Sequence, residues 1–248
     1  GSSNVAMGRD ALTANTTASN NTAVGYASLG ANTTGTENTA LGAYALDANT
    51  TANSNTAVGY SSLGANTTGT LNVAIGKDAL RDNTTAGANT AVGTVSMRLN
   101  TTGASNTAVG YGSLDTNTTG GNNVAIGRDS LTANTTGANN TAVGYQALTT
   151  NTTGQLLTAV GHQALTANSG DTYSTALGAR TLQSNTTGFE NVAVGDLSSN
   201  ANTTGGYNVS VGNRSLQSNT TASNNTAVGH SALVANTTGS DNVSVGSQ

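Results

Sequence analysis

The chain repeats one pattern of apolar and polar residues every seventeen positions. Glycine preceded by an aliphatic residue or Met recurs at this spacing from Gly8 to Gly246, with no insertion or deletion. If each such glycine is position 0, position −2 is Ala or Ser in every copy, and position +4 is Leu except at Met97 and Ser199. A period this strict predicts stacked copies of one structural unit.

The run from −4 to −1 reads polar, β-branched, small, β-branched, which predicts a short strand ended by the glycine. Helix is excluded because the aliphatic positions −1 and +4 lie five residues apart and Asn-Thr-Thr-Gly interrupts the repeat. A second short strand is predicted through +3 and +4, after which Asn-Thr-Thr-Gly turns the chain back. The aliphatic side chains at −1 and +4, with Val where it occurs at −3, are expected to form the interior.

Residues 1–248 are therefore predicted to form a single all-β domain. The expected architecture is a β-solenoid, a single-chain β-roll of about 14 coils with a 17-residue repeat, in which each strand edge is satisfied by the next coil. Its interior is thin, so stability must come from stacking, asparagine ladders and lateral association. No polar terminal cap is visible, and the chain is expected to be a segment of a longer array; end-to-end continuation of chains is the alternative.

Asparagine occupies position +7 in every full repeat, and these residues are called the turn asparagines. One interpretation is a ladder of side-chain amides that bond along the stack. The other is N-glycosylation, because most copies read Asn-Thr-Thr. The ladder is the favoured interpretation, since a sugar on every coil would crowd its neighbours. The turn asparagines are Asn15, Asn32, Asn49, Asn66, Asn83, Asn100, Asn117, Asn134, Asn151, Asn168, Asn185, Asn202, Asn219 and Asn236.

Positions +1 and +2 suggest an outward column in which cations lie against aromatic rings of neighbouring coils. A solvated charged face is the alternative. The residues predicted to stack are Arg9, Tyr26, Tyr60, Lys77, Tyr111, Arg128 and Tyr145.

The repeat is least regular from Gln155 to Ser174 and again near Leu197, where Ser199 replaces the core leucine. A ligand site in these coils is one interpretation. Sequence drift in a tolerant coil is the favoured one.

Composition and charge argue against several classes of function. Charged residues are 7% of the chain and the net charge is −4, so nothing attracts nucleic acid or an anionic membrane. No apolar run reaches the ~20 residues of a spanning helix, so membrane insertion is not expected. His162 and His230 lie four coils apart, and no serine occupies a nucleophile elbow. No catalytic, cofactor-binding or metal site is predicted, and the chain is not expected to be an enzyme.

The repeat Asn-Thr-Ala-Val-Gly-Tyr, continued through Leu and Asn-Thr-Thr-Gly, resembles arrays in tail-fibre-domain proteins of phages and bacteria. Its Asn-to-Gly core is also similar to the head repeats of trimeric autotransporter adhesins, although those repeats are shorter than seventeen residues. The resemblance implies a homotrimer of parallel rolls packed about a threefold axis, located outside the cell as a cell-surface or virion fibre.

The expected function is a structural and adhesive fibre shaft, a rigid spacer that makes multivalent contacts with itself and with host-surface glycans or proteins. One alternative is an ice-binding solenoid that uses threonine ladders. Val5, Val73 and other valines interrupt the threonines at −3, and the adjacent threonines at +8 and +9 face opposite ways, so a flat Thr-x-Thr face is not predicted. A self-assembling extracellular filament is a further alternative.

Overall fold

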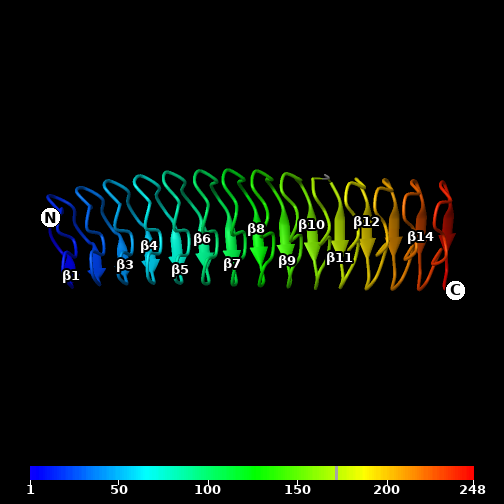
Figure 1. Ribbon diagram of the computed structural model, residues 1–248, viewed down its shortest axis with the longest axis horizontal. Helices are drawn as coiled ribbons and strands as arrows, with labels where there is room; N and C mark the ends of the chain where they lie inside the picture. Colours follow the sequence, from blue (N-terminus) through cyan, green and yellow to red (C-terminus); the bar gives the residue numbers. More distant parts are fainter. Residues whose placement is uncertain (171–172) are drawn as a thin grey trace. The chain divides into compact units, whose positions relative to one another are not determined.

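The computed structural model describes residues 1–170 and 173–248 as short parallel strands joined by turns, with no helix in these ranges (Figure 1). The chain is an all-β solenoid of about 14 turns, which confirms the predicted fold class. It divides into two compact units, residues 1–122 and 123–248.

The first unit contains β1 (Val5–Met7), β2 (Thr22–Val24), β3 (Thr39–Leu41), β4 (Thr56–Val58), β5 (Val73–Ile75), β6 (Thr90–Val92) and β7 (Thr107–Val109). The second contains β8 (Val124–Ile126), β9 (Thr141–Val143), β10 (Thr158–Val160), β11 (Thr175–Leu177), β12 (Val192–Val194), β13 (Val209–Val211), β14 (Thr226–Val228) and β15 (Val243–Val245).

Within each unit, neighbouring strands pair in parallel at a register of one full repeat. In the first unit Ala23 lies opposite Ala40, and in the second Ala159 lies opposite Ala176. The hydrogen bonds run to both neighbouring coils: Thr22 N–H donates to the Asn38 carbonyl, and Gly25 N–H to the Met7 carbonyl, both at 2.8 Å. Each inner strand is thus satisfied along both edges.

The predicted second strand at +3 and +4 is wrong, because this segment consists of turns. Neighbouring residues of a strand face opposite sides, yet Ser28 (+3) and Leu29 (+4) are both buried. Left-handed backbone at Ala27 (φ 55°) and Leu29 (φ 49°) turns both side chains inward. Leu29 N–H still donates to the Ala45 carbonyl of the next coil, so the turns are tied to one another along the stack.

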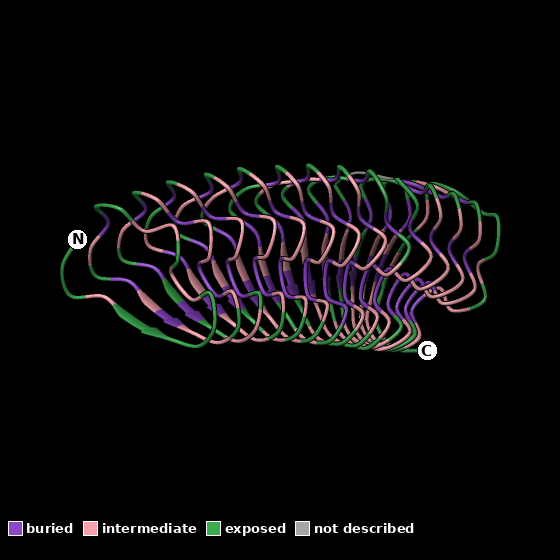
Figure 2. Cartoon of the chain, turned by 60° about the vertical axis from the view of Figure 1, so that its left-hand side comes forward, coloured by how far each residue is buried: buried purple, intermediate pink, exposed green. Residues whose placement is uncertain are grey.

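The predicted interior is also wrong in part. The middle residue of each inner strand, Ala at −2 in most copies, faces inward, while the side chains at −3 and −1 face outward. Ala57 is fully buried, for example, whereas Leu41 and Ile75 are 48% and 39% exposed. Figure 2 shows buried residues recurring at the same places in successive coils. The core combines small residues at −2 and +3, the predicted leucine at +4, and two columns of asparagine.

The glycine at position 0 makes close stacking of the coils feasible. Gly25 has φ of 134°, and a Cβ added to it would lie 2.5 Å from the Gly42 carbonyl oxygen of the next coil. Any side chain here would push neighbouring coils apart, which explains why no copy lacks the glycine.

Candidate functional site

The turn asparagines form the predicted ladder inside the solenoid. Asn49 Nδ2 donates to Asn32 Oδ1 at 2.8 Å, and Asn202 Nδ2 to Asn185 Oδ1 at 2.7 Å in the second unit. Most of these amides also close their own turn, as Asn49 Nδ2 does by donating to the Ala52 carbonyl at 3.1 Å; the Asn168 amide is the exception and has no partner among the described residues. The ladder is confirmed, and the members within it are buried, which argues against glycosylation of the folded chain. Asn15 and Asn236, in the first and last coils of the sequence, are partly exposed.

A second asparagine column at position −4, here called the strand asparagines, was missed by sequence reasoning. Asn38 N–H donates to Asn21 Oδ1 at 3.0 Å, and Asn21 Nδ2 reaches across its coil to the Gly35 carbonyl at 2.9 Å. This column therefore joins successive coils and closes the coils that carry the asparagine. The signal was present as an Asn before most of the strands, but it was interpreted as ordinary polar alternation.

The irregular coils keep the hydrogen bonds between coils at the three substitutions that the structure describes, Leu157, Ser174 and Ser199, whereas the buried Asn168 amide has no hydrogen-bond partner within residues 1–170 and 173–248. Leu157 replaces a strand asparagine, is buried, and still donates its N–H to Asn140 Oδ1 at 3.0 Å. Ser199 replaces the core leucine and bonds Ser210 Oγ at 2.8 Å, which in turn bonds Ser198 Oγ at 2.7 Å. A ligand is therefore not needed to satisfy these buried hydroxyls. Asp171 and Thr172, within the other irregular stretch, lie outside the described residues.

The outward column at +1 brings some of the predicted cations and rings together. The Arg9 guanidinium carbon lies 5.5 Å from the Tyr26 ring centroid, and that of Arg128 lies 5.8 Å from Tyr145. Both arginines also pair with the next residue in sequence, at 3.2 Å and 3.1 Å. Lys77 lies 3.9 Å from Asp78.

Tyr60 and Tyr111 are exposed in the same column. Tyr60 packs on Tyr44 rather than on a cation, with centroids 5.8 Å apart, and Tyr44 packs on Tyr26 at 5.1 Å. Tyr44 occupies +2 in the copy whose +1 residue is Ala43, so its ring fills the place that the alanine leaves. Burial, and then the neighbouring Tyr26, raise the pKa of the Tyr44 phenol. This three-ring cluster was not predicted.

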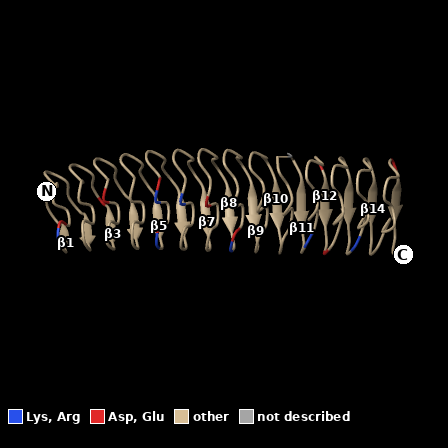
Figure 3. Ribbon diagram, viewed as in Figure 1, with Lys and Arg blue, Asp and Glu red and all other residues tan. Residues whose placement is uncertain are grey.

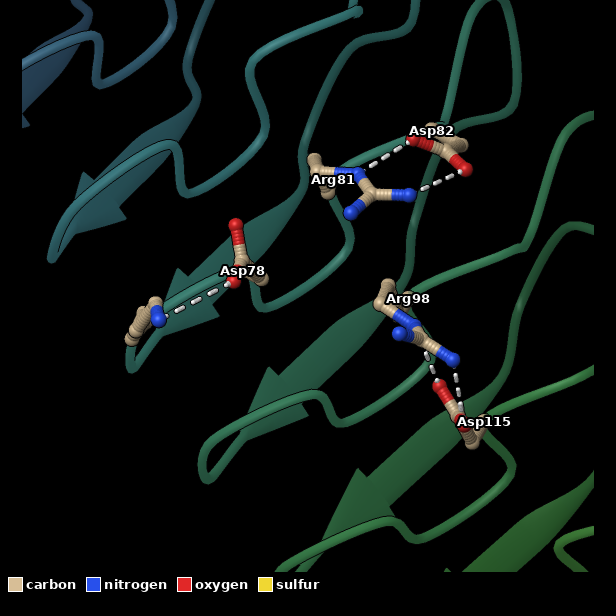
Figure 4. Close-up of polar contacts among 6 residues, drawn as sticks. Asp78, Arg81, Asp82, Arg98 and Asp115 are labelled. Carbon is tan, nitrogen blue, oxygen red and sulfur yellow. Dashed lines mark hydrogen bonds and ion pairs between the residues drawn. The ribbon is translucent and has the colours of Figure 1, made fainter.

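Among the residues that the structure describes, the charged ones lie between the strands and not in them (Figure 3). In the first unit two arginines form bidentate pairs: Arg81 with Asp82 at 2.7 and 2.9 Å, and Arg98 with Asp115 of the next coil at 3.0 Å (Figure 4). Burial raises the pKa of the Asp115 carboxyl, and Arg98 opposes that rise. The pKa of Asp47 is also raised, chiefly by burial.

A candidate interaction surface is the outward side of each unit's sheet, formed by the side chains at −3 and −1 and here called the sheet face. Position −3 is Thr or Val and position −1 is Val, Ile, Leu or Met, so neither position carries a charge in any copy. Val109 and Val160 are 36% and 37% exposed there. Parallel sheets are usually covered on both faces, and this one is covered on its inner face alone.

Within residues 1–170 and 173–248, no group of His, Asp or Glu side chains is arranged to hold a metal ion, and no helix is long and apolar enough to cross a membrane. No protein-family model and no curated protein sequence matches the chain.

Proposed function

We propose that this chain is part of the shaft of an extracellular or virion-surface fibre. It acts as a spacer that makes multivalent surface contacts and performs no catalysis. The observation that carries the proposal is the sheet face, which repeats one uncharged, partly aliphatic surface in every coil without covering it. A surface of this kind favours association with another apolar surface.

The partner that fits the sheet face best is another copy of the same chain. The face is periodic within each unit, so two or three copies can align coil against coil and bury the −1 side chains of many coils together. Burial of aliphatic area at about 25 cal/mol per Å² would compensate for the thin core of each coil. The resemblance to tail-fibre and autotransporter repeats supports three copies about a threefold axis.

The test is the solution mass of the chain by sedimentation equilibrium. The unmodified chain is expected to be a trimer, and Val58→Lys with Val92→Lys, which place two charges on the sheet face, should give monomers. The matched control is Thr68→Lys with Thr102→Lys, two exposed residues in the same coils but at position +9, and it should remain trimeric. A monomeric parent chain, or a trimer that survives the sheet-face charges, would contradict the proposal. Open-ended growth would instead favour a filament.

Ice binding is a second candidate because threonines at −3 lie outward on a regular sheet. Thr22, Thr39 and Thr56 occupy this position in consecutive strands, beside the aliphatic side chains at −1. Thermal hysteresis at micromolar concentration, together with a monomeric mass, would favour this candidate over the shaft.

A further inference from the structure

One corner of the second unit carries aromatic side chains that the fold does not require. Position +12, here called the corner position, holds Tyr173, Glu190 and Tyr207 in three consecutive coils. Both tyrosines are exposed, at 59% and 50%, as is Phe189 beside Glu190. Tyr173, Glu190 and Val192 line an open groove of about 430 Å³.

The backbone at the corner position makes these side chains unfavourable for folding. Tyr173, Glu190 and Tyr207 have φ of 63°, 53° and 58°, in the left-handed region that favours asparagine among residues with side chains. Some other copies use asparagine there, as at Asn139, but others use leucine, as at Leu71. The backbone alone therefore does not distinguish this corner. Its two exposed tyrosine rings do, because they contribute nothing to the core and so indicate a role other than stability.

The Tyr207 ring is held in place by its neighbours. The Phe189 and Tyr207 ring centroids lie 4.9 Å apart at an interplanar angle of 78°, and Tyr207 N–H donates to the Phe189 carbonyl at 3.0 Å. Gly206 makes room for this arrangement, since a Cβ there would lie 3.0 Å from that carbonyl oxygen and 3.4 Å from the Phe189 ring. A braced ring loses little conformational freedom when a ligand packs on it.

We propose that this corner binds a neutral saccharide. The two tyrosines are two coils apart, roughly 9–10 Å at the usual strand spacing, with the Glu190 carboxylate on the coil between them. A sugar ring presents an apolar C–H face, which packs on a tyrosine ring, and hydroxyl groups, which donate to the carboxylate in charge-assisted hydrogen bonds.

The charge of Glu190 determines whether a neutral or an acidic saccharide can bind. Glu190 forms no ion pair with any residue in the described ranges. Its charge therefore repels acidic sugars and leaves its oxygens available to hydroxyl donors. This inference extends the proposed shaft function, because association of several chains would multiply one weak saccharide contact per chain.

The test is an NMR titration of the full chain with three neutral hexasaccharides: maltohexaose, cellohexaose and chitohexaose. Oligosialic acid is the acidic comparison. Tetramethylammonium chloride tests whether the site binds a cation instead of a sugar. We expect at least one neutral hexasaccharide to bind, and the acidic oligomer to bind at least about tenfold more weakly. Tyr207→Asn and Tyr173→Asn remove a ring while installing the residue that suits the backbone. Each should weaken binding at least about tenfold while the melting temperature stays equal or rises.

Glu190→Gln should weaken binding of the neutral sugar and reduce the discrimination against oligosialic acid. Tyr60→Ala, an exposed ring in the other unit, should leave binding unchanged. Three results would overturn the proposal: no binding of any neutral hexasaccharide, undiminished binding to Tyr207→Asn, or binding of tetramethylammonium alone. None of these results depends on the oligomeric state, so the failure of this site and the failure of the shaft proposal can be told apart.

Discussion

At the scale of single residues, the interior is stabilised by amide groups as much as by aliphatic ones. The leucine at +4 packs against small residues at −2 and +3, and the two asparagine columns fill the rest of the inward positions. Asn38 shows how one amide makes both kinds of hydrogen bond. Its Nδ2 donates to the Ala52 carbonyl and so closes its own coil, and its Oδ1 accepts from Asn55 N–H in the next coil. Buried amides are tolerated in such a narrow interior because nearly all of their hydrogen bonds are made, with the Asn168 amide as the exception in the part of the chain that the structure describes.

Asn66→Ala tests the contribution of the ladder. Asn66 Oδ1 accepts from Asn83 Nδ2 at 2.9 Å, and Asn66 Nδ2 donates to Asn49 Oδ1 at 3.3 Å. Removing the amide leaves buried polar groups of both neighbours without this partner, which should lower the free energy of unfolding by about 1–3 kcal/mol in chemical denaturation. Thr68→Ala, an exposed change in the same coil, should stay within about 0.5 kcal/mol. Equal effects of the two changes would refute a stabilising ladder.

At the scale of the coil, the segment from position +1 to position +9 that follows each strand is here called the arch. It is held by left-handed turns rather than by a second strand. The arch presents two different surfaces along the first unit: the aromatic cluster of Tyr26, Tyr44 and Tyr60, and the charged pairs that include Arg98 with Asp115. The Arg98 pair joins adjacent coils through partly buried groups. Asp47, in contrast, lies between two coils that carry glycine at the same position, Gly30 and Gly64.

Asp47→Asn tests the electrostatics of the arch. Burial raises the pKa of Asp47 in the folded chain, so the ionised carboxylate disfavours folding at neutral pH. That penalty is relieved as pH falls through the raised pKa, and it vanishes below the ordinary carboxyl value of about 4. Asp47→Asn should therefore raise the melting temperature at pH 7 and leave it unchanged near pH 3.

Glu37→Gln, a change at an exposed carboxyl one coil away, serves as the control and should not reproduce this pH-dependent difference. If Asp47→Asn instead lowers the melting temperature at pH 7, the carboxylate stabilises the arch, and its environment has been misassigned.

At the scale of the molecule, the period alone was enough to predict a parallel solenoid, its repeat length and the turn-asparagine ladder. It was not enough to predict which side chains face inward. Leu29 and Val24 both looked like core residues, but Val24 lies on the outward side of a three-residue strand, and Leu29 reaches the interior through a left-handed turn that its residue type does not signal. The corner aromatics were not predicted either, because their backbone conformation is visible only in three dimensions.

The central claim is that the coils are equivalent, and deletion of one whole coil tests it most directly. Removing residues 53–69 joins Ala52 to Thr70 and restores every column. In a solenoid whose coils interact only with their neighbours, stability is the sum of similar increments. Removal of residues 60–68 is the control: it takes out fewer residues but leaves a strand without its arch.

We expect thermal unfolding of the one-coil deletion to stay cooperative, with a melting temperature close to that of the parent, and the partial-coil deletion to be strongly destabilised. The opposite order, with the whole-coil deletion unfolded and the partial-coil deletion tolerated, would contradict the account.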